Sequence, residues 1–433
     1  MNVVFFLLIL IAFIVTAFQQ IGWTPDNPDA VSPMTALTDG MIKSAGASVE
    51  LAIGLIGIMA FFLGLMKVAE EGGLLRVIAK VLRPIMVRLF PEVPGDHPAM
   101  GAMIMNMSAN ALGLGNAATP FGIRAIQELD KLNPHKGTAT NSMALFLAIN
   151  TSGVALLPTG VIGLRVAAGS ADPAGILPTT LFATLCSTVV AIIATKIYQR
   201  FSPIPDHLSS EPQTTVETNT SDSEPEELPE EATDEYPAWV SFLAIGALIV
   251  FIPIAIIYGK VITPWIIPGL AILLLGFGMV KKVRIYETFV VGAKDGFNVA
   301  IMIIPYLVAI LVAVGMFRYS GALDYLVALV GPFTSKFGLP AEALPMALMR
   351  PLSGSGALGV VAETINNPAI GPDSYIGYLV STFQGSTETT FYVIAVYFGA
   401  VQVRRVRHAL AAGLTADIAG VIGAIIACSF LLR

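Results

Sequence analysis

The stretch "ALMRPLSGSGALGVVAE", residues 347–363, decides how this sequence can fold. It places Arg350 and Pro351, followed by a run of glycines and serines, inside a very apolar chain. Hydrocarbon disfavours an unpaired cation, and it tolerates irregular backbone only where protein or a water-filled cavity covers it. The stretch therefore predicts the tip of a re-entrant hairpin at 350–359 rather than a transmembrane helix.

The composition indicates a polytopic helical membrane protein. Of 433 residues, 55% are hydrophobic and 12% are charged, about half the charged fraction of a soluble domain. The clearest apolar runs, each roughly long enough to span a bilayer, are 3–18, 49–66, 176–194, 240–258, 261–280, 300–317 and 409–432. The first run lacks a basic flank and a cleavage site, so it predicts a retained helix and not a signal peptide. The two cysteines, Cys186 and Cys428, lie in predicted helices and form no metal-binding motif.

An acidic segment at 201–236 divides the chain. It contains no lysine or arginine and has few residues that could build a core, which predicts a disordered, self-repelling linker. The residues on either side, 1–200 and 237–433, are predicted to be two membrane modules. The linker is expected to be a simple tether, and a partner-binding role is the alternative.

The two modules resemble each other. The stretch "GLLRVIAKVLRP" at 73–84 matches "GALDYLVALVGP" at 321–332 in its Gly-x-Leu start and its closing proline. In each module this stretch follows an apolar run and precedes a small-residue segment, a second polar segment and a final apolar run, in the same order. Four such matches in one order predict an internal repeat.

Basic residues near the helix ends predict the orientation. One consistent threading puts all the basic clusters in the cytoplasm, at 67–88, 196–200, 281–294 and 404–407. The N-terminus and the linker are then cytoplasmic, and the C-terminus is periplasmic or extracellular. Run 49–66 points inward while its counterpart 300–317 points outward, so the repeats are predicted to be inverted. Alternating-access transporters share this architecture and bind solute where their repeats meet.

A second re-entrant hairpin is predicted for "NMSANALGLGNAATPFG" at 106–122, which is too glycine-rich for a helix facing lipid. The amides of Asn106, Asn110 and Asn116 and the hydroxyl of Thr119 are then candidate substrate-binding groups. Tight packing of small residues between helices is the alternative. It would explain the glycines and alanines but not three asparagines.

The hairpin at 350–359 is predicted to bind an anionic or polar group. Glycines next to Ser353 and Ser355 expose backbone N–H groups, and Arg350 adds a permanent cation with several donors. The alternative is an arginine that pairs with an internal acid for structural reasons. Glu388 is the expected partner.

Two discontinuous helices are predicted to complete the cavity. In the first module Asn150 and Thr151 precede Pro158, which kinks or breaks a helix. In the second module the polar residues of "QGSTETTFY" are the candidates Gln384, Ser386, Thr387, Glu388 and Thr389. Glu388 either neutralises Arg350, titrates as a coupling proton site, or joins Thr389 as a ligand for sodium.

These segments resemble the spore maturation proteins. "GLGNAATPFGIRAIQEL" (113–129) and "NTSGVALLPTGVIGLR" (150–165) are similar to the A protein. "RPLSGSGALGV" (350–360) and "GPDSYIGYLVSTFQGSTETTFYVIAVYFGAV" (371–401) are similar to the B protein. The resemblance implies a natural bacterial A–B fusion with a nucleoside-recognition Gate domain, shared with concentrative nucleoside transporters and ferrous iron permeases. Iron transport is disfavoured because both cysteines lie outside the re-entrant motifs.

The expectation is an all-α polytopic protein of the bacterial inner membrane, built from two inverted Gate repeats with re-entrant hairpins and discontinuous helices. It is expected to transport a small polar, anionic or nucleoside-like solute by alternating access, coupled to H⁺ or Na⁺. The sequence has no P-loop, dinucleotide fingerprint, nucleophile elbow or zinc spacing, so we expect no enzyme, ATP-driven pump, cofactor or metal site.

The expected partners are the bilayer and the solute, with a homo-oligomer compatible and no nucleic acid. Two rival functions are a flippase for lipid intermediates or envelope precursors, and a non-transporting membrane factor that acts through partners.

Overall fold

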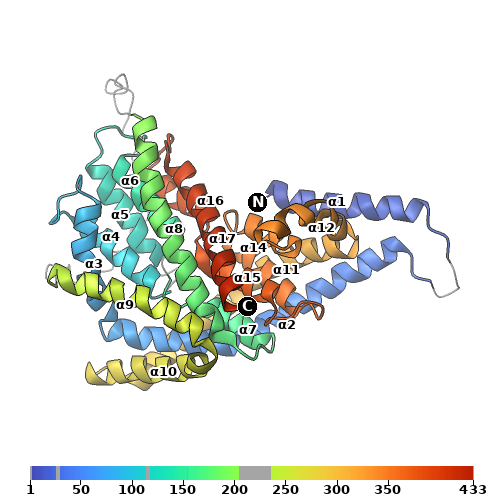
Figure 1. Ribbon diagram of the computed structural model, residues 1–433, viewed down its shortest axis with the longest axis horizontal. Coiled ribbons are helices and arrows are strands. Elements are labelled where there is room, and N and C mark those ends of the chain that lie inside the picture. Colours follow the sequence, from blue (N-terminus) through green and yellow to red (C-terminus); the bar gives the residue numbers. More distant parts are fainter. Residues whose placement is uncertain (1, 26–29, 114–117, 154, 204–235, 433) are drawn as a thin grey trace.

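The computed structural model describes residues 2–25, 30–113, 118–153, 155–203 and 236–432, whose regular elements are all helices (Figure 1). The helices before the linker are α1 (Asn2–Ile21), α2 (Pro33–Glu71), α3 (Leu74–Leu89), α4 (Pro98–Ala111), α5 (Thr119–Lys131), α6 (Asn141–Ser152), α7 (Thr159–Ala167) and α8 (Ile176–Tyr198). Those after it are α9 (Ala238–Ile257), α10 (Gly259–Val280), α11 (Ile285–Tyr319), α12 (Ala322–Thr334), α13 (Leu344–Met349), α14 (Gly354–Asn366), α15 (Tyr375–Ser386), α16 (Thr390–Val393) and α17 (Ala409–Leu431). The predicted linker, 201–236, lies almost entirely outside the described residues.

Two repeats with the same order of elements form most of the structure, α2–α8 and α11–α17. A left-handed glycine precedes α3 and its counterpart α12, at Gly73 (φ 83°) and Gly321 (φ 74°). A second matched pair, Gly137 (φ 77°) and Gly371 (φ 73°), lies shortly before α6 and α15. Glycine adopts this backbone without steric cost, so both pairs mark equivalent turns. The predicted internal repeat is confirmed.

The two longest helices, α2 and α11, are counterparts that pack in antiparallel directions. An ideal Cβ on Gly40, near the start of α2, would lie 2.5 Å from the ring of Tyr319 at the end of α11. An ideal Cβ on Gly296, nearer the start of α11, would lie 2.6 Å from the backbone of Ala60. Because counterparts run in opposite directions, the repeats are inverted as predicted.

The final helices of the repeats, α8 and α17, are also antiparallel. The Tyr198 hydroxyl, at the end of α8, lies 3.0 Å from the hydroxyl of Thr415 near the start of α17. Farther along, an ideal Cβ on Gly423 would lie 3.1 Å from Cα of Ala183. Figure 1 shows α17 in the middle of the molecule beside α8, while α1, α11, α12 and part of α2 extend to one side.

The chain is a multi-pass membrane protein. Four helical segments are long and apolar enough to cross a bilayer: Pro33–Glu71, Pro173–Phe201, Ile285–Tyr319 and Ala409–Leu431. Shorter apolar segments are Phe5–Ile21, Trp239–Ala255 and Pro264–Val280. The last two belong to α9 and α10, which are separated only by Tyr258.

One helix is longer than the apolar run that predicts it. Helix α2 begins at Pro33, before the run 49–66, so residues 33–48 are helical as well. The Ser32 hydroxyl accepts from the Thr35 N–H and caps this start, and Pro33 suits the first helical position. Helix α3 contains Pro84 and continues to Leu89.

Buried apolar side chains hold the broken helices in place on two sides. One cluster packs α15 against α14 through residues such as Leu379, Phe383 and Val361. Another packs α6 against α4, α5 and the π-helix Ile394–Phe398 that continues α16. The polar segments between these clusters are therefore held by rigid neighbours.

Candidate solute-binding site

The first re-entrant hairpin consists of α4 and α5, and the end of α4 lies against a broken helix. The N–H of Leu156, in the break between α6 and α7, donates to the carbonyl of Ala111 at 2.9 Å. Gly113 has φ 74°, and an ideal Cβ there would lie 2.5 Å from the carbonyl oxygen of Leu157. Only glycine satisfies both the backbone angle and this close approach. The glycine-rich sequence is thus explained by the hairpin.

The second hairpin has the same relation to the other broken helix. Helix α13 ends at Met349, and the Ser353 hydroxyl accepts from the Gly356 N–H at 3.0 Å to start α14. The N–H of Phe391, just after the break between α15 and α16, donates to the Pro351 carbonyl at 3.1 Å. Both predicted re-entrant hairpins and both discontinuous helices are therefore present.

The breaks of the two repeats touch each other. Helix α6 ends at Ser152 and α15 ends at Ser386. The N–H of Glu388, inside the second break, donates to the Thr151 carbonyl at 2.6 Å. An ideal Cβ on Gly153, inside the first break, would lie 3.2 Å from Cγ of Glu388. The two polar helix breaks, more than 200 residues apart in sequence, thus contact each other. We call this contact between the breaks after α6 and α15 the crossing.

Arg350 is buried at this crossing with a loose ionic partner. Its guanidinium donates to the carbonyl of Thr387 and, at 3.3 Å, to the hydroxyl of Thr389. Its Nη2 lies 3.5 Å from Oε2 of Glu388, whose side chain is 49% exposed. The Nε of Arg350 has no partner among the described residues. Arg350 therefore pairs with Glu388, as one alternative from the sequence expects, and still has an unused buried donor.

The remaining predicted residues of the second repeat lie around this arginine. Gln384 donates from Nε2 to the Gly354 carbonyl at 3.4 Å, and its Oε1 lacks a partner in the described part of the chain. Ser355 is half-buried in the first turn of α14. The Ser386 hydroxyl is buried and donates to the Phe383 carbonyl at 2.9 Å. Gly354, the first residue of α14, lies beside Arg350, since an ideal Cβ there would lie 3.5 Å from Nη1 of the arginine.

The asparagines of the first repeat form a cluster with one tyrosine of the second. Asn110 donates from Nδ2 to Oδ1 of Asn150 at 3.0 Å, and the Tyr397 hydroxyl donates to the same oxygen at 3.3 Å. Asn106 donates from Nδ2 to the Tyr397 oxygen at 3.2 Å, and its Oδ1 has no partner within the described ranges. Tyr397 belongs to the π-helix, an irregularity common at functional sites. Sequence reasoning missed this tyrosine.

Three other predicted residues of the first repeat are not part of this asparagine–tyrosine cluster. Thr151 is fully buried, and its hydroxyl has no hydrogen-bond partner among the residues that the structure describes. Thr119 is the first residue of α5 and is half-buried. Asn116 lies outside the described residues.

A buried carboxylate close to the crossing was also missed. Asp417, in α17, is 5% exposed. Its Oδ2 accepts from the hydroxyl of Thr390 at 2.6 Å, and its Oδ1 has no partner in the described chain. The signal that could have found it is a single acid inside the apolar run 409–432.

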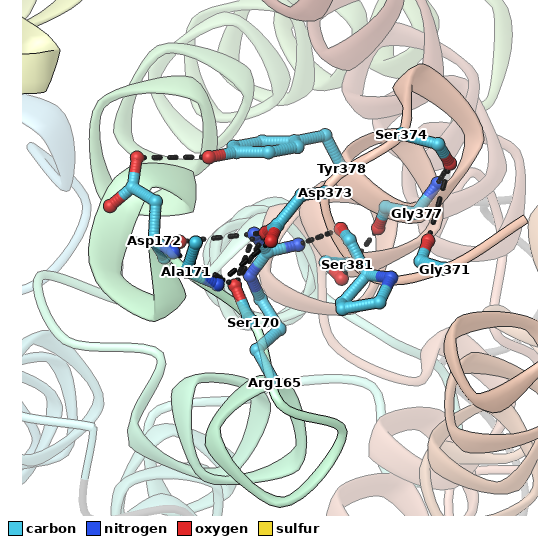
Figure 2. A network of polar contacts seen from close by, with 11 residues as sticks. Arg165, Ser170, Ala171, Asp172, Gly371, Asp373, Ser374, Gly377, Tyr378 and Ser381 are labelled. Carbon is cyan, nitrogen blue, oxygen red and sulfur yellow. Dashed lines mark hydrogen bonds and ion pairs between the residues drawn. The ribbon is translucent and has the colours of Figure 1, made fainter.

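A second buried arginine, Arg165, ties the repeats together away from the crossing (Figure 2). It is fully buried, and its Nη1 donates to the Pro372 carbonyl at 2.6 Å. Its Nη2 donates to Oδ1 of Asp373 at 2.9 Å and to the carbonyl of Asp172 at 3.0 Å. The guanidinium also lies 4.2 Å from the ring centroid of Tyr378. We call the contacts of Arg165 with Pro372, Asp373 and Tyr378 the arginine latch.

A cavity of about 470 Å³ lies between α2, α11 and the end of α14. Its charged lining residues are Lys43, Glu50, Arg318 and Glu363. Arg318 and Glu363 form an ion pair across it. None of the predicted site residues lines this cavity, but α14 connects it to the crossing near Arg350.

Known proteins match both repeats. The nucleoside-recognition family named Gate matches residues 52–168 and 300–404. Spore maturation protein B of Bacillus subtilis is 49% identical over 168 residues, which are 39% of this chain and 91% of that protein. Spore maturation protein A of the same organism is 43% identical over 162 residues, which are 37% of this chain and 83% of that protein. The predicted resemblance is confirmed and is consistent with a fusion.

One solved structure, the YdaH transporter of Alcanivorax borkumensis, aligns with 98% of this chain and 97% of its own. Its sequence identity is 13% and the TM-score is 0.36, too low to indicate a shared fold.

Proposed function

We propose, from the premise that this chain belongs to the nucleoside-recognition Gate family, that it is a secondary transporter of a small polar solute. The observation that carries the proposal is the crossing itself. Two broken helices of inverted repeats touch there through Glu388 and Thr151, beside a buried arginine with an unused donor. Inverted repeats with discontinuous helices at their interface are the framework of alternating access.

The solute in this proposal carries an anionic or nucleoside-like polar group. The N-terminus of α14 follows Arg350 closely, and helix N-termini carry positive partial charge and free N–H groups. Arg350 offers its Nε, and Gln384 offers an unpaired carbonyl oxygen among the described residues. Asn106, Asn110 and Asn150 orient the polar part of the solute from the opposite repeat. Thr387 and Thr389 hold the guanidinium in position.

Transport proceeds in this proposal by rocking of one repeat against the other, driven by H⁺ or Na⁺. The 470 Å³ cavity is the vestibule on the non-cytoplasmic side, with Arg318 and Glu363 at its wall. The protein lies in the bacterial inner membrane with its N-terminus and linker in the cytoplasm, as the basic residues favour. Its C-terminus is then periplasmic.

The test is solute binding and uptake by the purified full chain. A thermal-shift screen of nucleosides, carboxylates and envelope precursors selects solutes, and uptake into proteoliposomes follows for each one. Arg350→Ala is expected to weaken binding by at least about tenfold, because a lost hydrogen bond to a charged group costs roughly 1.5–3 kcal/mol. Lys131→Ala, which removes an exposed cation paired with Glu128, is the matched control and keeps wild-type uptake.

Two results would contradict the proposal. If Arg350→Ala takes up every solute as wild type does, the site is wrong. If wild type binds and moves no solute but scrambles labelled lipids across the same vesicles, the protein is a flippase and not a solute transporter.

A further inference from the structure

The carboxylate of Asp417 is the starting point, because its burial is only partly compensated. The side chain is 5% exposed, and one hydrogen bond from Thr390 satisfies one of its oxygens. The other oxygen is buried with no partner among the described residues. A buried carboxylate is costly unless it is paired, hydrogen-bonded or bound to a cation. Thr387 and the positive charge of Arg350 also act on this carboxylate, and its Oδ1 is the oxygen left open to a ligand among the described residues.

The helix face around Asp417 is covered by hydroxyl groups from both breaks. Gly413, Asp417 and Gly420 share one face of α17 by their spacing. An ideal Cβ on Gly413 would lie 3.5 Å from the Thr151 hydroxyl, and one on Gly420 would lie 3.4 Å from the Ser386 hydroxyl. The two glycines let the ends of both broken helices lie close to the face of α17 that carries Asp417.

A second, independent observation points to a ligand at the same place. The Thr151 hydroxyl is fully buried and has no partner within the part of the chain that the structure describes. Helices α6 and α15 both end here, at Ser152 and Ser386, and helix C-termini carry negative partial charge. The Thr151 and Thr387 carbonyls already accept hydrogen bonds from Glu388 and Arg350, so the open oxygens are the Thr151 hydroxyl and Oδ1 of Asp417. Negative partial charge beside these oxygens attracts a cation.

The charges at the crossing favour one monovalent cation. Arg350 contributes +1, while Glu388 and Asp417 contribute −1 each, so these three groups sum to −1. One monovalent ion neutralises this sum, and a divalent ion would leave an excess positive charge. Carboxylate, hydroxyl and carbonyl oxygens suit a hard cation. Broken helices in sodium-coupled transporters bind Na⁺ with such oxygens.

We propose that Asp417, together with Thr151 and Thr390, binds the coupling sodium ion of this protein. The inference rests on the proposed function and replaces Glu388, which is 49% exposed, as the coupling residue. The ligands come from α6, α16 and α17, so the ion holds both repeats together at their crossing. Solute binding and closure around Arg350 are thereby linked to the presence of sodium.

The test measures thermal unfolding of the full chain in NaCl, with KCl and choline chloride replacing it at constant ionic strength and without solute. Wild type is expected to gain a saturable increase in Tm with Na⁺ alone, because an ion that binds only the folded state stabilises it. Asp417→Asn is expected to abolish that increase. Thr151→Val is expected to raise the midpoint sodium concentration by at least about tenfold, or roughly 1.4 kcal/mol.

A control variant makes the result specific. Thr415→Val removes another hydroxyl of α17, which donates to the Ala411 carbonyl, and it keeps the sodium response. If Asp417→Asn does not fold, the test rests on the midpoint sodium concentration of Thr151→Val. The inference is overturned if Thr151→Val responds like wild type, if K⁺ works as well as Na⁺, or if only pH changes the Tm.

The sodium site and the proposed transport can fail separately. Uptake that is independent of sodium would reject the ion site and leave the transporter. A specific sodium response without uptake of any solute would support the ion site and reject the transporter.

Discussion

Arg165 and Arg350 are two buried arginines, and their guanidinium groups differ in their ionic and aromatic partners. Arg165 has partners on both terminal nitrogens, including a carboxylate at 2.9 Å, and an aromatic ring against its plane. Arg350 has a loose carboxylate partner at 3.5 Å. In both arginines the buried Nε has no partner among the described residues. The first arrangement suits a structural tie, and the second suits a group that accepts a ligand.

Removing Arg165 is expected to destabilise the fold. In Arg165→Met the carbonyls of Pro372 and Asp172 lose their donor, while Asp373, 39% exposed, is rehydrated. We expect the free energy of unfolding to fall by about 3 kcal/mol, measured by thermal or chemical unfolding in detergent. Lys131→Met, on an exposed side chain, is the control. A variant as stable as wild type would show that the latch contributes nothing.

Sequence predicts part of the crossing residue by residue. Asparagines in a glycine-rich apolar segment indicate a polar lining, and Asn106, Asn110 and Asn150 do meet at Tyr397. Asp417 cannot be found in the same way, because it lies in a regular apolar helix with no irregularity nearby in sequence. Its importance depends on hydroxyl groups that only the folded chain brings to it.

At the scale of elements, helix breaks are predictable and helix lengths are not. Glycine, proline and clustered polar residues mark the ends of α6 and α15, because they either cannot continue a helix or compete with its hydrogen bonds. The start of α2 at Pro33 is invisible to hydropathy, because its first part contains Asp39, Lys43 and Glu50. Packing against α11 keeps that polar part helical.

Close approach of α2 and α11 is expected to depend on glycine at the contact. Gly296→Ala places a Cβ 2.6 Å from the Ala60 backbone and should cost about 1–3 kcal/mol of stability through overpacking. Gly57→Ala, where a Cβ meets nothing within 4 Å, is the matched control and should be neutral or stabilising by up to about 1 kcal/mol. Equal melting temperatures for the two variants would refute the prediction.

At the scale of the whole molecule, each repeat forms hydrogen bonds to a loop of the other repeat. In both cases the loop directly precedes a broken helix, α15 or α6. The arginine latch joins α7 to the loop before α15. In the equivalent place, the N–H groups of Arg404 and Arg405 donate to the Gly137 carbonyl, before α6, at 2.9 and 3.0 Å. We call these two hydrogen bonds the backbone latch. This exchange follows from the inversion, which the distribution of basic residues predicts. The chemistry of each contact does not follow, because it depends on side-chain geometry.

The two halves are expected to assemble without a covalent connection. Residues 1–203 and 236–433, expressed as separate chains, should purify together through a tag on one of them, because both latches and the Glu388–Thr151 hydrogen bond cross between halves. Arg165→Met in the first chain should reduce the recovered partner. If the tagged half is recovered alone from the membrane, the linker is required for assembly.

The two latches also differ in what holds them. One depends on a charge pair whose acid is 39% exposed, and the other on backbone amides that bond to carbonyls. Salt screens the partly exposed charge pair to some extent and leaves hydrogen bonds between backbone groups nearly unchanged. If the two halves were identical, both contacts would respond to salt in the same way. Because they differ, raising the salt concentration should loosen one end of this scaffold before the other.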